Sequence, residues 1–344
     1  MKKQPRKVSR ILVVGPSWAG DMVMAQSLFV VLKQRHPETV IDVLAPSWSN
    51  PLLNHMPEVN RTVEMPIGHG RLGLKERWRL GRWLSHQHYD QAIVLPNSLK
   101  SALTPFFAGI PRRTGWLGEM RYGLLNDVRR LDKQQLPMMV QRFVALTLEP
   151  DEGKLPPIPP PALRVEPEDV HQALADLNLP RPQTRMLALC PGAEFGPSKR
   201  WPETRYAELA RRYLARGWEV WLFGSTKDQP VCAEIDRLCG NACTDLSGST
   251  SLAQAVDLLS LASAAVSNDS GLMHVAAALN RPLVAVYGST DPGFTPPLNT
   301  NSRVVRLGLD CSPCFKRECP LGHLRCLHDL QVDQVTAALE ELDA

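Results

Sequence analysis

Residues 264–279 read AAVSNDSGLMHVAAAL, which is an apolar run, a polar loop and an apolar segment with helical spacing. Ala264–Val266 is typical of a buried strand, and Leu272–Leu279 predicts a helix. A strand that leads through a short loop into a helix is the repeating unit of a parallel α/β sheet. Ser270 and Gly271 would expose their N–H groups at the start of that helix, where the helix dipole favours phosphate. The stretch therefore predicts an anion site at the end of a parallel strand.

The same alternation of strand and helix extends from this stretch in both directions. Strands separated by helices imply parallel sheets that are covered on both faces. The fold class is therefore α/β, and ligands are expected at the carboxyl ends of the strands. The other expected strands are residues 11–14, 40–44, 92–95, 186–189, 219–223 and 283–287, and the other expected helices are residues 22–34, 206–216, 252–262 and 332–342.

A proline-rich stretch divides the chain. Seven prolines stand from Pro150 to Pro167, and proline neither donates to a strand ladder nor continues a helix. The stretch is typical of a stiff, extended linker, and a chain of 344 residues suits two domains better than one core. We expect an N-terminal domain over residues 1–160 and a C-terminal domain over residues 161–344, with the final helix able to pack back on the N-terminal domain.

The composition narrows the functional class. The chain is 44% hydrophobic and 22% charged, as globular proteins are. Its net charge of +4 suits an anionic small molecule or a phosphate-rich membrane surface better than nucleic acid. The N-terminal segment Met1–Arg10 is rich in basic residues, and only the short apolar run Ile11–Val14 follows it. A signal peptide needs an apolar region of ~7–15 residues. We expect a cytoplasmic protein, whose eight cysteines are thiols or metal ligands rather than disulfides.

The loop Gly15–Asp21 joins the first strand to the first helix. Its Gly-x4-Gly spacing imitates a phosphate-binding loop, but Asp21 replaces the required Lys and would repel phosphate. A carboxylate at this place could take a proton from an acceptor hydroxyl. An Asp could equally cap the helix start, which contributes ~1 kcal/mol. The pattern alone favours the cap.

Two further loops carry candidate groups. In residues 190–202 (CPGAEFGPSKRWP), glycines allow backbone N–H groups to approach an anion and Lys199 supplies charge; a solvated basic turn is the alternative. In the opening stretch, Asp269 could accept from a sugar hydroxyl and His274 lies within reach of the same anion, although a cap and a core histidine are the plainer interpretations. With the strand-end loops 224–228 and 288–290, the pattern favours a nucleotide site in this half.

Together these motifs resemble glycosyltransferase family 9, the ADP-heptose:lipopolysaccharide heptosyltransferases. The resemblance spans about residues 10 to 300. Its motifs are Gly20-Asp21, KRWP (199–202), NDSGLMH (268–274), GPSW (15–18), LPNS (95–98), RRTGW (112–116), RYGLLND (121–127) and PGAEFG (191–196).

The resemblance implies a GT-B architecture, in which two Rossmann-like domains with parallel sheets face a central cleft. The C-terminal domain would hold ADP-heptose, the N-terminal domain would hold the acceptor, and the transfer would invert the anomeric configuration. Asp21 would be the catalytic base, and Lys199 would contact the diphosphate and support catalysis. The other residues implied in donor binding are Glu194, Asp228, Asp269, Ser270, Gly271 and His274, and those implied in acceptor binding are Arg112, Arg113 and Arg121.

The resemblance also implies an acceptor, the first heptose on the lipid A–Kdo inner core of lipopolysaccharide in a Gram-negative bacterium. That acceptor is anionic and lies on the inner membrane, so peripheral contact with the membrane is expected. A basic and aromatic segment could make that contact, although a solvated helix face has the same composition. The segment holds Arg71, Lys75, Arg77, Trp78, Arg79, Arg82 and Trp83.

No cofactor is expected for catalysis, because Lys199 and the helix start at Ser270 supply positive charge to the leaving diphosphate and no Asp-x-Asp pair lies near the site motifs. The alternatives that stay open are heptosyltransferase I or another family member with a different acceptor, a non-enzymatic nucleotide-binding scaffold, and a zinc-dependent regulatory protein. Nucleic acid is not an expected partner.

The last candidate site is a cysteine cluster. Four thiolates suit a structural zinc, for which His323 or His328 could replace one ligand. The spacing matches no standard zinc-finger or ferredoxin pattern, and a metal-free cysteine-rich loop is equally favoured. The cluster consists of Cys311, Cys314, Cys319 and Cys326.

Overall fold

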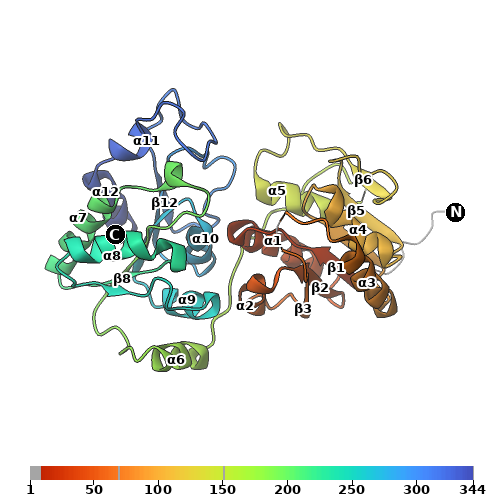
Figure 1. Cartoon of the computed structure of the whole chain (residues 1–344), viewed down its shortest axis with the longest axis horizontal. Helices are drawn as coiled ribbons and strands as arrows, with labels where there is room; N and C mark the ends of the chain where they lie inside the picture. Colours follow the sequence, from red (N-terminus) through yellow and green to blue (C-terminus); the bar gives the residue numbers. More distant parts are fainter. Residues whose placement is uncertain (1–8, 69, 150–151, 344) are drawn as a thin grey trace. The chain divides into compact units, whose positions relative to one another are not determined.

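The computed structural model describes residues 9–68, 70–149 and 152–343, and it forms two compact units, Met1–Pro160 and Pro161–Ala344. The boundary lies within the proline-rich stretch. Each unit has a sheet at its centre and helices around it (Figure 1). Residues 1–8, which begin the segment examined for a signal peptide, and Pro150 of the expected linker lie outside the described residues.

The first unit is built on a six-stranded parallel sheet in the order β3-β2-β1-β4-β5-β6. The central strands are buried on both faces, which is why they show continuous apolar runs instead of alternation. The strand order reverses between β1 and β4, so the loops after these two strands leave the sheet in opposite directions. The strands are β1 (Arg10–Val14), β2 (Val40–Ala45), β3 (Arg61–Glu64), β4 (Gln91–Val94), β5 (Arg112–Trp116) and β6 (Asp127–Arg129).

Helix α1 (Ala19–Arg35) is buried without a break from residue 22 to residue 29, and it packs against α5. A helix buried on all sides carries no polar stripe, and its few polar groups are paired: the Ser27 hydroxyl donates to the Pro159 carbonyl at 2.7 Å. The other helices of this unit are α2 (Asn50–Asn54), α3 (Leu74–Leu84), α4 (Leu99–Phe107) and α5 (Met139–Val144), with 3-10 turns η1 (Ser47–Ser49), η2 (Ser85–Gln87) and η3 (Ala145–Thr147).

The second unit repeats the plan, with a parallel sheet in the order β12-β11-β10-β7-β8-β9. Here the order reverses between β7 and β10. Both sheets therefore have the strand order of a dinucleotide-binding Rossmann sheet. The strands are β7 (Met186–Cys190), β8 (Glu219–Leu222), β9 (Thr244–Asp245), β10 (Ala264–Asn268), β11 (Leu283–Val286) and β12 (Ser302–Val305).

The helices of the second unit close a single core around this sheet. Helix α12 packs on β11, β12 and α7, and its Val335 and Leu339 are buried in the core of this unit. Helix α12 thus belongs to the core of the second unit, and the expectation that it packs back on the N-terminal domain stays a prediction. The helices are α6 (Pro167–Asp176), α7 (Glu203–Ala215), α8 (Gln229–Leu238), α9 (Leu252–Leu259), α10 (Gly271–Ala278), α11 (Arg325–His328) and α12 (Val332–Asp343), with turns η4 (Pro197–Lys199) and η5 (Thr226–Asp228).

The expected strands are all present, and the sequence pattern missed several others. β5 begins with two arginines, and β12 is a partly exposed edge strand, so neither has an apolar run. Helix α1 begins three residues earlier than expected, at Ala19. Among the described helices, none is long and apolar enough to span a bilayer.

Candidate active site

The candidate groups of the second unit lie at one edge of its sheet. Because all its strands are parallel, the loops that follow β7, β8, β10 and β11 emerge together at the carboxyl edge. Lys199 comes from the loop after β7, and Asp269 directly follows β10. These are the two strands between which the order reverses, so the sheet itself brings the two residues to its switch point.

A charged cluster occupies that switch point. The Lys199 ammonium lies 2.6 Å from Asp269 Oδ2, and the Thr290 hydroxyl donates to the same oxygen at 2.5 Å. The side chains of Lys199 and Asp269 are only 14% and 4% exposed. The cluster therefore holds one cation and one anion in a shielded place, where a second anion would compete directly for Lys199. Thr290 was not recognised as a site residue, although its loop after β11 was expected at this edge.

The start of helix α10 adds a positive partial charge beside the cluster. Ser270 is the N-cap residue and Gly271 the first helical residue, and the Ser270 hydroxyl lies 3.2 Å from the Ser267 hydroxyl. His274 is only 5% exposed. Desolvation by this burial lowers its pKa to about 4; the charge of Asp269 acts to raise the pKa, and the charge of Lys199 acts to lower it. His274 is therefore a neutral donor and acceptor at neutral pH.

Asn268 holds the loop after β7 against β10. Its side-chain oxygen accepts from the Trp201 N–H at 3.0 Å and from the Tyr206 hydroxyl at 3.1 Å, and its amide donates to the Pro191 carbonyl at 2.6 Å. The side chain is fully buried, so these bonds act without competition from water. Asn268 thereby fixes both ends of the segment that carries Lys199, a role that the sequence motif alone did not reveal.

The other two donor candidates engage nearby groups of their own unit. Glu194 pairs with Lys227 at 2.6 Å, and both side chains are more than half exposed. Asp228 is buried, and its Oδ2 accepts from the backbone N–H and the hydroxyl of Ser225, at 2.9 and 2.7 Å. Asp228 thus closes the turn after β8, and its role in donor binding stays a prediction.

Asp21 lies in the first turn of α1, directly after the loop that leaves β1, so it stands at the switch point of the first sheet. The N-cap residue of α1 is Trp18, without a side-chain cap. Asp21 is the third helical residue, and the interpretation as an N-cap is therefore wrong. Its position in the first turn still benefits from the helix dipole.

The three arginines assigned to the acceptor are bound to the chain's own oxygens. Arg112 pairs with Asp127 at 2.9 Å and Glu149 at 2.7 Å. Arg113 donates to the carbonyls of Leu124 at 2.6 Å and Ile110 at 2.5 Å.

Arg121 is 1% exposed and donates to the carbonyls of Pro96, at 2.6 Å, and Trp116. A buried guanidinium cannot touch a substrate, so the expected direct contact between Arg121 and the acceptor is not supported. Arg121 instead ties the loop after β4 to the loop after β5, and it supports this edge of the first sheet from within.

The four cysteines of the cluster are free thiols that line one cavity of about 20 Å³, together with His323. Within residues 9–68, 70–149 and 152–343, no group of three or more His, Cys, Asp or Glu side chains is arranged to hold a metal ion. The zinc site thus finds no support in the structure and stays a prediction of the sequence alone.

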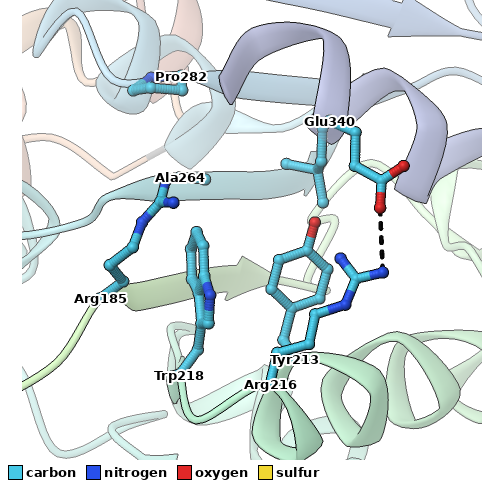
Figure 2. Close-up of a pocket in the computed structure, with 8 residues that line it drawn as sticks. Arg185, Tyr213, Arg216, Trp218, Ala264, Pro282 and Glu340 are labelled. Carbon is cyan, nitrogen blue, oxygen red and sulfur yellow. Dashed lines mark hydrogen bonds and ion pairs between the residues drawn. The ribbon is translucent and has the colours of Figure 1, made fainter. Parts of the chain in front are cut away.

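A cavity of about 200 Å³ lies at the opposite, amino edge of the second sheet (Figure 2). It is lined by aromatic and basic side chains, and both arginines already have partners. The guanidinium carbon of Arg185 lies 4.1 Å from the ring centre of Trp218, and Arg216 pairs with Glu340 at 3.0 Å. The cavity is separate from the cluster around Lys199.

Comparisons with known proteins agree with this arrangement. The model of glycosyltransferase family 9 (heptosyltransferase) matches residues 77–325. Lipopolysaccharide heptosyltransferase 2 of Escherichia coli is 50% identical, over 97% of this chain and 98% of its own. Lipooligosaccharide heptosyltransferase 2 of Haemophilus influenzae is 51% identical, over 86% and 88%. The solved structure of E. coli ADP-heptose lipopolysaccharide heptosyltransferase II superposes with a TM-score of 0.84 at 47% identity, covering 97% and 100%. The fold is thus GT-B, and the chain belongs to glycosyltransferase family 9, the heptosyltransferases.

Proposed function

We propose that this enzyme transfers L-glycero-D-manno-heptose from ADP-heptose to the first heptose of the lipopolysaccharide inner core, with inversion at the anomeric carbon. The proposal is supported by about 50% identity to heptosyltransferases 2 over nearly the whole chain. The structural observation that carries it is the cluster of Lys199, Asp269 and Thr290 beside the start of α10. This cluster suits a nucleotide diphosphate.

The donor diphosphate would bind at the carboxyl edge of the second sheet. Lys199 is paired with Asp269, the residue directly before the N-cap of α10, and the N–H groups of Ser270 and Gly271 add the helix dipole. Asp269 would then be left to accept from a sugar hydroxyl, with the Thr290 hydroxyl holding its orientation. Buried, neutral His274 adds hydrogen bonding without a second full charge.

The chemical step follows from where charge develops. The acceptor oxygen attacks the anomeric carbon from the face opposite ADP while the bond to the diphosphate oxygen breaks. Negative charge therefore grows on the leaving diphosphate, where Lys199 and the α10 start stabilise it; preorganised groups of this kind contribute several kcal/mol. Asp21 would take the proton of the attacking hydroxyl. These groups complete the charge balance, and we propose that no metal ion takes part.

Contact with the membrane is the second part of the proposal. On α3, Leu74 and Trp78 are 53% and 51% exposed, and Lys75, Arg79 and Arg82 are exposed beside them. A face with apolar anchors and basic groups suits an anionic bilayer. Arg77 faces inward and donates to the Leu72 carbonyl at 2.7 Å, so it does not belong to this face.

Sedimentation of the protein with anionic vesicles tests this membrane contact. The double variant Trp78→Ser, Arg82→Gln should sediment less than the wild type, and equal vesicle binding by the two proteins would refute the contact.

The deciding experiment supplies ADP-heptose with two lipid A–Kdo acceptors, one that carries the first heptose and one that lacks it. Mass analysis should show addition of one heptose only to the first acceptor. Addition to the acceptor without heptose would identify heptosyltransferase I activity instead. Binding of ADP-heptose without any transfer would favour the scaffold alternative.

A further inference from the structure

The cysteine-rich segment (residues 309–328) lies against the loop that carries Lys199. We call residues 191–200 the donor loop. The Ser198 N–H donates to the Arg317 carbonyl at 3.3 Å, the Phe315 N–H donates to the Ser289 carbonyl at 2.7 Å, and the Ser289 N–H donates to the Ser198 carbonyl at 3.2 Å. The donor loop, the loop after β11 and the cysteine-rich segment thus form one hydrogen-bonded junction, and Thr290 follows directly in the second of these.

The donor loop packs closely against both the cysteine-rich segment and the loop after β11. Gly196 has a φ of 149°, and a Cβ atom there would lie 2.6 Å from the Arg317 carbonyl oxygen. The Ser198 side chain is 1% exposed, and its hydroxyl donates to the Lys316 carbonyl at 2.5 Å and lies 3.0 Å from the Ser289 hydroxyl. The donor loop therefore has no room to shift toward the cysteine-rich segment.

Arg317 adds the side-chain part of this contact. Its Nε donates to the Phe195 carbonyl at 2.6 Å, and its Nη2 donates to the Glu194 carbonyl at 3.3 Å. Its guanidinium carbon lies 5.9 Å from the ring centre of Phe195, and Lys199 Nζ lies 5.0 Å from the same ring centre. One aromatic ring thus contacts both cations, and two successive carbonyls of the donor loop are held by one side chain.

We propose that Arg317 is a positioning residue for Lys199: it orders the donor loop before the diphosphate arrives. The proposal rests on the proposed function, because Lys199 matters only if this site binds the donor. Within the donor loop, the turn η4 has backbone bonds of its own, from the Lys199 N–H to the Gly196 carbonyl at 3.1 Å and from the Arg200 N–H to the Pro197 carbonyl at 3.0 Å. The preceding residues 191–195, which Arg317 holds at two carbonyls, lie outside this turn, so contacts with neighbours contribute to their order. Binding to an ordered loop avoids the entropy that ordering would cost, and small errors in the position of a charged group slow catalysis strongly.

The test compares Arg317→Ala with Arg325→Ala, a control in the same segment whose side chain pairs with Asp329 at 2.8 Å. Arg317→Ala should weaken ADP binding and lower kcat/KM for ADP-heptose by about tenfold, mainly through KM, while Arg325→Ala should change either value less than twofold. Arg317→Lys, which keeps the charge but not the forked geometry, should recover only part of the loss. Equal behaviour of Arg317→Ala and Arg325→Ala would overturn the proposal.

A double-mutant cycle separates positioning from direct contact with the donor. In a Lys199→Ala background, Arg317→Ala should cost less than about twofold, because the positioned group is gone. Full tenfold losses in both backgrounds would mean that Arg317 binds the donor by itself, which also overturns the proposal. ADP affinity, measured by calorimetry, is independent of transfer. A wild-type enzyme that binds ADP but transfers no heptose would therefore contradict the proposed function and leave this test intact.

Discussion

Lys199 and Asp269, 70 residues apart in the chain, meet at 2.6 Å at the carboxyl edge of the second sheet, and both side chains are largely shielded from water. Each neutralises the other, and neither charge is left alone in a region of low dielectric. In the proposed function, a diphosphate that reaches Lys199 would replace one anion by another. The pair therefore keeps a cation ready in a place where an isolated ammonium would be costly.

Replacing Lys199 tests the role of this pair. Lys199→Ala should raise KM for ADP-heptose and also lower kcat, because the diphosphate is charged in the ground state and gains charge in the transition state. We expect kcat/KM to fall by about 10²-fold or more, the range for loss of one charged stabilising group. Lys133→Ala, which removes an exposed lysine of the first unit, is the control. Equal donor affinity in the two variants would place the diphosphate elsewhere.

Asp21 should affect chemistry and spare donor binding. Asp21→Asn should lower kcat by roughly 10²–10⁴, the contribution of a general base, while ADP binding measured by calorimetry stays within about twofold of wild type. Its position as the third residue of α1 predicts only a small loss of stability in urea unfolding. Glu38→Gln, at an exposed residue after the same helix, should change neither value. Near-normal turnover of Asp21→Asn would reduce this carboxylate to a helix-dipole partner.

His274 predicts how stability depends on pH. Burial lowers its pKa to about 4 from an ordinary 6.5, so the folded state holds it neutral. Its contribution to stability is complete above pH 6.5 and is lost as the pH falls from 6.5 toward 4, because the unfolded chain binds the proton first. Between pH 7 and 4, the free energy of unfolding of wild type should fall by up to about 3 kcal/mol more than that of His274→Gln. Exposed His171→Gln should follow wild type. Parallel curves for wild type and His274→Gln would contradict the burial of a neutral imidazole.

Arg121 should act on the fold of the first unit. Its removal takes the guanidinium donor from the Trp116 carbonyl and leaves the Pro96 carbonyl with the Ser101 hydroxyl, at 3.0 Å. An unpaired buried group costs ~1–3 kcal/mol, so Arg121→Ala should lower the free energy of unfolding by about 1–3 kcal/mol. Exposed Arg130→Ala should lower it by less than about 0.5 kcal/mol. Full stability of Arg121→Ala, combined with a loss of acceptor binding only, would restore the interpretation that Arg121 contacts the acceptor.

Removal of metal ions should leave catalysis intact. The leaving diphosphate can be stabilised by Lys199 and the start of α10, so transfer in the presence of EDTA should proceed at the untreated rate. Complete loss of activity that Mg²⁺ restores would contradict the proposed charge balance. Zinc analysis of the purified protein tests the cysteine cluster separately, since a structural zinc would survive as bound metal without changing the chemical step.

Local pattern was sufficient for the α/β fold class and for the expectation that the strand-end loops of the second unit meet at one edge, whereas the GT-B architecture was implied by the resemblance. The apolar runs identified the central strands because these strands are buried on both faces. Once the strands are parallel, the loops after them must meet at one edge, so Lys199, Asp269 and His274 were expected in one place from the sequence alone. The sequence pattern did not predict edge strands such as β12, because a half-exposed strand has no continuous apolar run.

Tertiary structure alone decided which of these groups touch. The bond from Thr290 to Asp269 spans 21 residues and that from Arg317 to Phe195 spans 122 residues, and no local period encodes such pairs. Burial likewise separated Arg121, which supports the sheet edge, from arginines at the surface, although all of them read alike in the sequence. The physical reason is that periodicity in the sequence reports which face of a helix or strand is buried. The partner of a polar side chain is instead selected by the packing of segments that are distant in the chain, and the separation of two segments in the chain does not predict their distance in space.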